Sequence, residues 1–61
     1  MKIEKLIEAR KNERYSQTQL GEKLGRNLSW VSRYENRETK LFFDDVVKLC
    51  ELLKIDIKDL I

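Results

Sequence analysis

Hydrophobic side chains recur every three or four residues in two stretches of the chain, one near each end. In residues 2–12, Ile3, Leu6 and Ile7 fall on one helical face with Arg10, and charged side chains occupy the other positions. This spacing predicts a first helix. A broader apolar stripe predicts another helix in the second half of the chain, formed by Phe43, Val46, Val47, Leu49, Cys50 and Leu53.

The middle of the chain carries the signals of a helix that begins and ends sharply. Ser16 and Gln19 have the spacing of a capping box, in which each side chain bonds a free backbone N–H of the other residue. Gly25 then suits the left-handed conformation in which many helices end, and which other residues resist by about 1 kcal/mol. A second helix is therefore predicted over residues 17–24.

A third helix follows this turn almost at once. Asn27 is suited to cap it, and we expect the helix to run from residue 28 to about residue 36. Val31 and Tyr34 would then face the core. The opposite face is polar and carries Ser29, Ser32, Arg33 and Asn36.

A short last helix is expected around Ile57, Leu60 and Ile61, and with it five helices fill the chain. A length of 61 residues allows one domain with one modest core, so residues 1–61 are expected to form a single domain. The chain has no proline and only two glycines, which favours a helical domain over a disordered or sheet-rich one. The predicted fold is an all-α, compact five-helix bundle.

Charge is unevenly distributed along the chain. The net charge is only +2, too small by itself to indicate a nucleic-acid partner. Residues 1–40 hold ten Lys and Arg against six Glu, a net of +4, whereas residues 41–61 hold three Lys against five acidic residues, a net of −2. One end of the chain is thus positive and the other is mildly acidic.

The residue types that carry catalysis are missing or badly placed. There is no histidine, no cluster of metal ligands and no glycine-rich loop that would hold a phosphate. Asp44 and Asp45 are neighbours that diverge by about 100° on a helix, so they cannot work together as an acid and a base. The positive end of a helix explains them better. No enzyme activity, metal, cofactor or small-molecule substrate is expected.

Cys50 is the only cysteine, which excludes an internal disulfide. Its apolar neighbours indicate a reduced thiol in the core of a cytoplasmic protein. The N-terminus alternates charged and apolar residues and lacks the apolar run of a signal peptide or a membrane span. We therefore expect a cytoplasmic protein without a membrane partner.

The segments SQTQLGEKLG and WVSRYEN, which lie within residues 16–36, resemble the helix-turn-helix of the lambdoid phage repressor and Cro family, also called XRE-like. The similarity extends over nearly the whole chain, because Arg10 in the first helix and the C-terminal segment KLCELLKIDIKDLI also match the pattern. The resemblance implies a five-helix domain that binds operator DNA, usually as a dimer, and a helix-turn-helix over about residues 17–36.

The resemblance also implies which residues touch DNA. Gln17 would contact the DNA backbone, and the outward residues of the third helix would read base edges. Arg33 is the strongest candidate, because a guanidinium can grip guanine through two hydrogen bonds worth about 1 to 3 kcal/mol of discrimination. The full set of candidate DNA-binding residues is Gln17, Asn27, Leu28, Ser29, Trp30, Ser32, Arg33, Asn36, Arg37 and Lys40.

Several of these candidates have a second explanation. Asn27 is a cap before it is a DNA contact, and Trp30 is equally suited to packing against the second helix. Arg37 and Lys40 are equally well explained as solvated surface charges. Leu28 stands where a polar base reader is usual in the family, and it suits a thymine methyl or a sugar instead.

The resemblance assigns structural roles as well. Arg10 and Glu35 match an ion pair between the first and third helices, and Gly21 matches a glycine that lets the second and third helices approach closely. Two arginines depart from the family pattern: Arg26 in the turn, where a small apolar residue is usual, and Arg37 after the third helix, where glycine is common. These arginines either add phosphate contacts or mark a backbone that differs locally.

Four apolar residues have two equally good explanations, as extra core or as dimer contacts. Exposed apolar clusters on small domains often mark the surfaces that bind a partner. The candidate dimer contacts are Leu41, Phe42, Ile57 and Ile61.

The function that the sequence indicates is a double-stranded-DNA-binding transcriptional regulator, expected to be a repressor that works as a homodimer on a palindromic operator. The alternative is a protein-interaction module, such as an antitoxin or an antirepressor, that uses the same fold and the same apolar residues. RNA binding is disfavoured, because the chain lacks an aromatic stacking platform. The length fits either a complete Cro-like protein or the N-terminal domain of a longer repressor.

Overall fold

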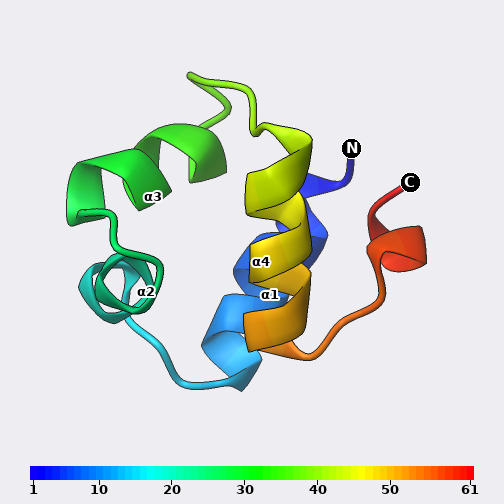
Figure 1. Cartoon of the computed structure of the whole chain (residues 1–61), viewed down its shortest axis with the longest axis horizontal. Helices are drawn as coiled ribbons and strands as arrows, with labels where there is room; N and C mark the ends of the chain where they lie inside the picture. The colour runs from blue at the N-terminus through cyan, green and yellow to red at the C-terminus, as the bar shows by residue number, and fades with distance from the viewer.

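The structure, a computed structural model, describes all 61 residues and consists of helices joined by short connections. Four of the helices are α-helices, and the last element is a single turn of 3-10 helix. Figure 1 shows their arrangement. The elements are α1 (Ile3–Asn12), α2 (Gln17–Lys23), α3 (Leu28–Glu35), α4 (Phe43–Leu53) and η1 (Ile57–Leu60).

The α-helices begin and end within one residue of the predicted limits, but the expected fifth helix is only a 3-10 turn. Asp56 caps this turn by accepting a hydrogen bond from the backbone amide of Lys58, and the amide of Asp59 donates to the carbonyl of Asp56. Four residues that bond in this i to i+3 pattern form the tighter helix, which is used in short pieces. The five-helix bundle is therefore corrected to four α-helices and one 3-10 turn.

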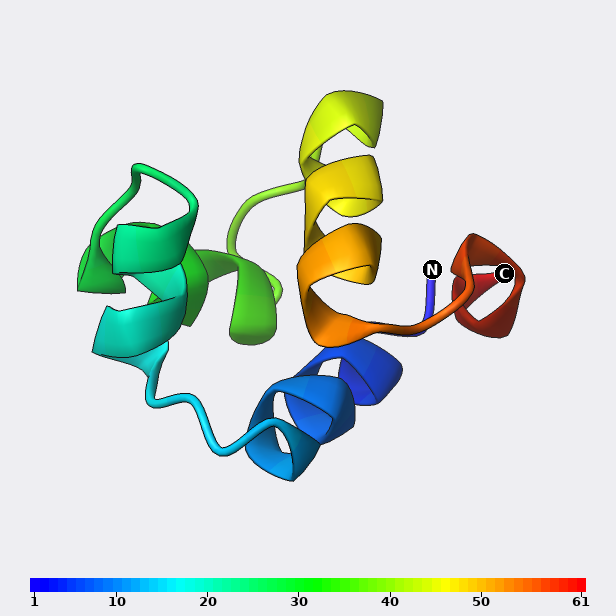
Figure 2. The same ribbon diagram turned by 60° about the horizontal axis from the view of Figure 1, so that its bottom comes forward.

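The helices form two groups that meet in the core. α2 and α3 lie side by side in one group, and α1 and α4 lie with η1 in the other, as the two views show (Figures 1 and 2). α1 contacts both groups, because it packs against α3 as well as against α4 and η1. The two ends of the chain meet, since the amide of Lys2 donates to the carbonyl of Leu60 over 2.7 Å. No helix combines the length and the apolar composition that crossing a bilayer requires.

One hydrophobic core joins all the elements. Val31 and Tyr34 face inward from α3, as predicted, and Cys50 is buried in α4. Full burial of a large apolar side chain stabilises the fold by about 1.5 to 3 kcal/mol relative to its exposure. The core residues are Leu6, Ala9, Leu20, Val31, Tyr34, Val46, Leu49, Cys50, Leu53 and Leu60.

Candidate nucleic-acid interface

The first residues of α2 are fixed by the predicted capping box. The hydroxyl of Ser16 accepts a hydrogen bond from the backbone amide of Gln19 over 3.0 Å, and the side-chain oxygen of Gln19 accepts one from the amide of Ser16 over 2.8 Å. Two amides at the start of the helix are thereby satisfied. Gln17, the first residue of the helix, is held in place beside this cap.

The turn between α2 and α3 depends on both glycines, for different reasons. Gly25 has a φ of +69°, the left-handed conformation that was predicted for it. At Gly21, a Cβ atom would lie 2.8 Å from the backbone oxygen of Asn27, so only a residue without a side chain fits there. Asn27 caps α3 as predicted, because its side-chain oxygen accepts from the amide of Trp30 over 3.0 Å.

The outward side of α3 and the start of α2 form one shallow hollow on the surface. Ser29 and Arg33 are exposed in it, and Ser32 is half-buried between them. Arg33 forms no ion pair, so its guanidinium is free to bind a ligand. The residues that line the hollow are Gln17, Leu28, Ser29, Ser32, Arg33 and Glu38.

Trp30 lies on a different side of α3 from this hollow. Its ring meets that of Tyr34 edge to face, with centroids 5.1 Å apart, and the guanidinium carbon of Arg26 lies 4.9 Å from its centroid. Trp30 is therefore packed within the protein, although it remains half-buried rather than enclosed.

Three further candidates surround the C-terminal end of α3. Asn36 ends the helix and its side-chain amide lies 3.4 Å from the hydroxyl of Ser32. Arg37 has a φ of 62°, so it adopts the left-handed conformation that favours glycine. Its side chain lies 3.3 Å from the carboxylate of Glu4, in an exposed pair. Lys40 is exposed in the connection to α4.

The pKa of the Glu4 carboxyl lies below its usual value, and the exposed pair with Arg37 is one of the causes. The pKa of Glu4 is lowered, first by a hydrogen bond from its own backbone amide and then by the charge of Arg37. An exposed pair of this kind contributes little to stability, because water and salt screen it.

Glu38 was not predicted to belong to the interface. Arg37 and Glu38 close a helix-ending motif, in which the amide of Arg37 donates to the carbonyl of Tyr34 over 3.1 Å and that of Glu38 to the carbonyl of Arg33 over 2.8 Å. This motif usually has glycine at its left-handed position. The sequence has Arg37 there and therefore did not reveal the motif. It places Glu38 in the lining of the hollow that also contains Arg33.

The ion pair between α1 and α3 is present and buried. Arg10 Nε donates to Glu35 over 2.7 Å, and Arg10 Nη2 donates to the second carboxylate oxygen over 3.2 Å. Two further hydrogen bonds complete the arrangement: Gln17 Nε2 donates to Glu35 over 2.9 Å, and Arg10 Nη1 donates to the carbonyl of Tyr15 over 2.9 Å. Glu35 is thus bonded from both α1 and α2.

Arg26 has a partner that the sequence did not reveal. Its Nη2 lies 3.0 Å from Oδ1 of Asp45, which is buried in the first turn of α4. Asp45 was interpreted only as a residue suited to a helix N-terminus, and it is also half of an ion pair. Arg26 was placed near the DNA face, but its guanidinium points to α4 and Trp30.

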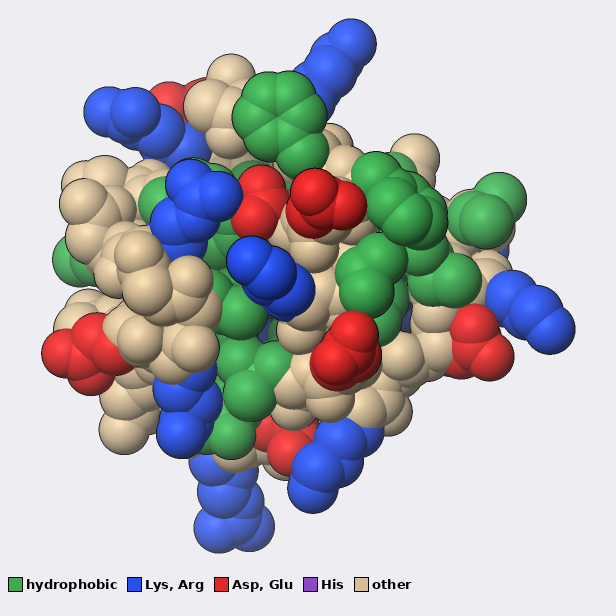
Figure 3. Space-filling view, viewed as in Figure 1, with side chains coloured by type: hydrophobic (Ala, Val, Ile, Leu, Met, Phe, Trp, Pro, Cys, Tyr) green, Lys and Arg blue, Asp and Glu red, His purple; other side chains and the backbone are tan.

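The candidate dimer contacts lie mostly together. Figure 3 shows hydrophobic side chains gathered between α4 and the C-terminal end of the chain. Phe42 is 77% exposed, so it is not extra core, and it does not line the hollow there. The residues of this apolar hollow are Met1, Leu41, Phe43, Val46, Ile57, Leu60 and Ile61.

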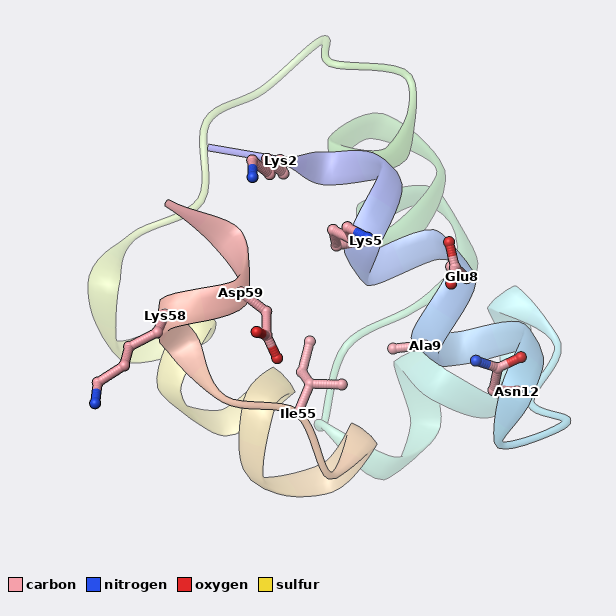
Figure 4. A pocket seen from close by; sticks show the side chains of 8 residues that line it. All are labelled: Lys2, Lys5, Glu8, Ala9, Asn12, Ile55, Lys58 and Asp59. Atoms are coloured by element: carbon pink, nitrogen blue, oxygen red, sulfur yellow. The ribbon is translucent and has the colours of Figure 1, made fainter.

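A third hollow, between α1 and η1, has mixed charge. Figure 4 shows that Lys58 points away from it, whereas Ile55 and Asp59 lie at its edge facing α1. Lys2 and Lys5 contribute positive charge and Glu8 negative charge. Nowhere in the chain do three or more His, Cys, Asp or Glu side chains meet in a way that would hold a metal ion.

Two buried groups titrate abnormally. Burial raises the pKa of Tyr34, and the charge of the neighbouring Glu35 raises it further; its hydroxyl has no hydrogen-bond partner. Burial also raises the pKa of the Cys50 thiol, with a smaller contribution from Asp56. Both groups stay protonated at neutral pH and belong to the core rather than to a reactive site.

Comparison with models of protein families identifies the family to which the chain belongs. The model of the helix-turn-helix domain matches residues 4–60, which is nearly the whole length. This match covers α2, α3, α4 and η1 completely, and all of α1 except its first residue. No curated protein matches the chain significantly, and no solved structure does so either.

Proposed function

The chain belongs to the helix-turn-helix domain family, and from this premise we propose that it is a sequence-specific regulator that binds double-stranded DNA through α3. The observation that carries the proposal is the outward hollow, where Ser29, Ser32 and the unpaired Arg33 lie beside Gln17. A helix that presents polar side chains in this way fits the major groove, whose base edges carry a distinct pattern of donors and acceptors.

Individual roles follow from the placement of the side chains. Arg33 reads a base, because its five donors are free and a guanidinium matches the two acceptors of guanine. Leu28, which is 48% exposed in the same hollow, contacts a thymine methyl or a sugar. The remaining candidates lie around these readers and bind phosphates or position the helix: Gln17, Asn27, Trp30, Asn36, Arg37 and Lys40.

We propose that the active species is a homodimer that represses transcription by blocking polymerase at a palindromic operator. The two half-sites of such an operator are about 34 Å apart, one helical turn of DNA. One copy of the chain measures 25 × 23 × 18 Å, so a single copy does not span both half-sites. The apolar hollow that contains Leu41, Ile57 and Ile61 supplies the contact between copies.

The proposed activity is binding and not catalysis, and its location is the cytoplasm. Asp45 forms an ion pair with Arg26, so it is not free to act with the adjacent Asp44 as an acid–base pair. The buried free thiol of Cys50 fits a reducing compartment.

The test of DNA binding is selection from random duplex DNA, followed by titration of the enriched sequence at several salt concentrations. We expect an inverted repeat with half-sites about one helical turn apart, and an affinity that falls steeply with salt as counterions are released. Failure to enrich any sequence, with no salt-dependent binding to duplex DNA, would overturn the proposal.

The dimer has its own test. Ile61 is 86% exposed, so Ile61→Ser leaves the fold intact while it removes apolar surface from the proposed contact. Sedimentation equilibrium is expected to show a dimer for the unaltered chain and weaker association for this variant. A monomer at every concentration in the absence and presence of DNA would contradict the dimer.

The same hollow supports a second candidate, an interaction module for another protein. Seven apolar residues line it without a polar one, which is unusual for the surface of a small domain. Apolar association changes little with salt, whereas DNA binding weakens steeply. This candidate would be favoured if the chain does not bind DNA and binds a protein partner with little salt dependence.

A further inference from the structure

Arg26 connects the turn before α3 to the first turn of α4. Its Nη2 lies 3.0 Å from Oδ1 of Asp45, whose side chain is only 12% exposed. A buried carboxylate is stable as an ion only when it is paired. Arg26 is the one cation that pairs with Asp45, so releasing Arg26 would leave a buried charge without a partner.

The same guanidinium also lies over the ring of Trp30 on α3. Its central carbon lies 4.9 Å from the centroid of the Trp30 ring, within the range of a cation–π interaction. Trp30 in turn meets Tyr34, which is completely buried, at an interplanar angle of 62°. A continuous series of contacts therefore runs from Asp45 in α4, through Arg26, to the core side of α3.

These contacts matter because α3 has few others to α4. The helix packs against α2 and α1, while α4 packs against α1 and η1. At its C-terminal end, α3 is fixed by the bond between Glu35 and Arg10. Arg26 provides the corresponding attachment at its N-terminal end, next to the cap Asn27. α3 is thus held at its C-terminal end by the Arg10–Glu35 ion pair and at its N-terminal end by the contact of Trp30 with Arg26, and both contacts resist rotation of the helix.

We propose that Arg26 is a positioning residue for the DNA interface: together with Asp45 and Trp30 it sets the orientation of α3, and it makes no phosphate contact. This inference rests on the proposed role of α3 in reading DNA. The guanidinium already binds the carboxylate of Asp45 and the ring of Trp30, so the positive charge of Arg26 is paired within the protein and is not directed at a phosphate.

The test compares Arg26→Ala, Arg26→Lys and Asp45→Asn with the unaltered chain, at a temperature where circular dichroism shows all four folded. The affinity for the selected duplex is divided by that for an unrelated duplex. We expect Arg26→Ala and Asp45→Asn to lower this ratio by about tenfold, which corresponds to 1.4 kcal/mol, and Arg26→Lys to lower it less. Asp45→Asn is decisive, because it removes a negative charge and would strengthen phosphate binding if positioning were irrelevant.

The salt dependence separates the two roles of a cation. A phosphate contact that is lost reduces the slope of log affinity against log salt by about 0.9, whereas a lost positioning contact leaves the slope unchanged. We expect an unchanged slope for Arg26→Ala. A slope reduced by that amount, or an unchanged affinity ratio in Asp45→Asn, would overturn the inference while leaving the proposed DNA binding intact.

Tryptophan fluorescence, measured without DNA, tests the attachment of α3 by Arg26 separately from the proposed DNA binding. Trp30 is the only tryptophan, so its fluorescence reports directly on the contact with Arg26. Arg26→Ala and Asp45→Asn are both expected to shift its emission to longer wavelength. An unaltered chain that binds no duplex overturns the proposed function and the DNA part of this inference, whereas an unmoved emission in Asp45→Asn overturns the attachment itself.

Discussion

The side-chain amide of Gln17 donates a 2.9 Å hydrogen bond to the carboxylate of Glu35, and this bond joins the start of α2 to the end of α3. Arg10 holds the same carboxylate from α1, over 2.7 and 3.2 Å. Three helices therefore meet at one buried group. One of the two N–H donors of the Gln17 amide is therefore engaged before any DNA arrives, and the second is left to donate to a phosphate.

Breaking this arrangement from the α1 side is expected to destabilise the whole domain. Arg10→Met removes the cation and leaves Glu35 buried with only Gln17 as a partner, which costs about 3 kcal/mol or more of unfolding free energy. Urea denaturation measures this loss. The double variant Arg10→Met with Glu35→Leu is the control, because it removes both charges and should recover most of the stability. A single variant that loses less than about 1 kcal/mol would show that Glu35 is not dependent on Arg10.

Base reading and phosphate binding are expected to separate by mutation. Arg33→Ala should weaken binding to the selected sequence by about 10-fold to 100-fold and change binding to unrelated duplexes little. Lys40→Ala should weaken binding to every duplex and lower the salt slope by about 0.9. Lys48→Ala, the same change on the exposed side of α4, is the control and should have no effect. Equal losses for Arg33→Ala and Lys40→Ala on all sequences would contradict the assigned roles.

Arg37 is expected to show opposite effects on stability and on DNA binding. Its φ of 62° is strained for a residue with a side chain, so Arg37→Gly should stabilise the fold by about 0.5 to 1 kcal/mol while it removes a charge near α3. Lys54→Gly is the matched control, because Lys54 has a φ of 59° at the end of α4. Thermal unfolding and DNA titration together test the pair. Only Arg37→Gly should weaken DNA binding, and equal affinities for both variants would remove Arg37 from the interface.

The two glycines are expected to respond differently to alanine. Gly21→Ala would place its Cβ 2.8 Å from the backbone oxygen of Asn27, and since backbone cannot move aside cheaply, a loss of about 2 kcal/mol or more is expected. Gly25→Ala meets nothing within 4 Å and pays only for its left-handed conformation, about 1 kcal/mol. Chemical denaturation would compare them. A larger loss for Gly25→Ala would contradict this account of the turn.

Local signals explain why so much of the fold was predictable. The capping box of Ser16 and Gln19, the cap Asn27 and the left-handed Gly25 each act within a few residues, so the sequence specifies them directly. A fifth helix was predicted where the structure has only one turn of 3-10 helix, because apolar spacing does not distinguish the two. Helical periodicity placed Arg33 on the outward face of the helix, and its candidate role as a base reader came from the family resemblance.

The missed contacts depend on how distant segments approach one another. Arg26 and Asp45 are 19 residues apart, and only the angle between the turn and α4 brings them together. Glu38 reaches the interface because Arg37 adopts a conformation that the sequence gives little reason to expect. Phe42 adjoins the apolar stripe of α4 but precedes its first turn, and there it points to solvent. Sequence periodicity within one element does not contain this information.

The orphaned hydroxyl of Tyr34 leads to a prediction about stability. The side chain is completely buried, its hydroxyl has no hydrogen-bond partner, and burial raises its pKa. A buried donor without a partner costs about 1 to 3 kcal/mol, and removing only that group keeps the shape of the ring. Tyr34→Phe is therefore expected to raise the unfolding free energy by up to about 1 kcal/mol in urea titrations, with the Trp30 contact preserved. Tyr34→Leu, which loses the ring as well, should be destabilised and serves as the control. A loss of stability in Tyr34→Phe would mean that the hydroxyl has a partner, such as a buried water, and would make Tyr34 a polar element of the core.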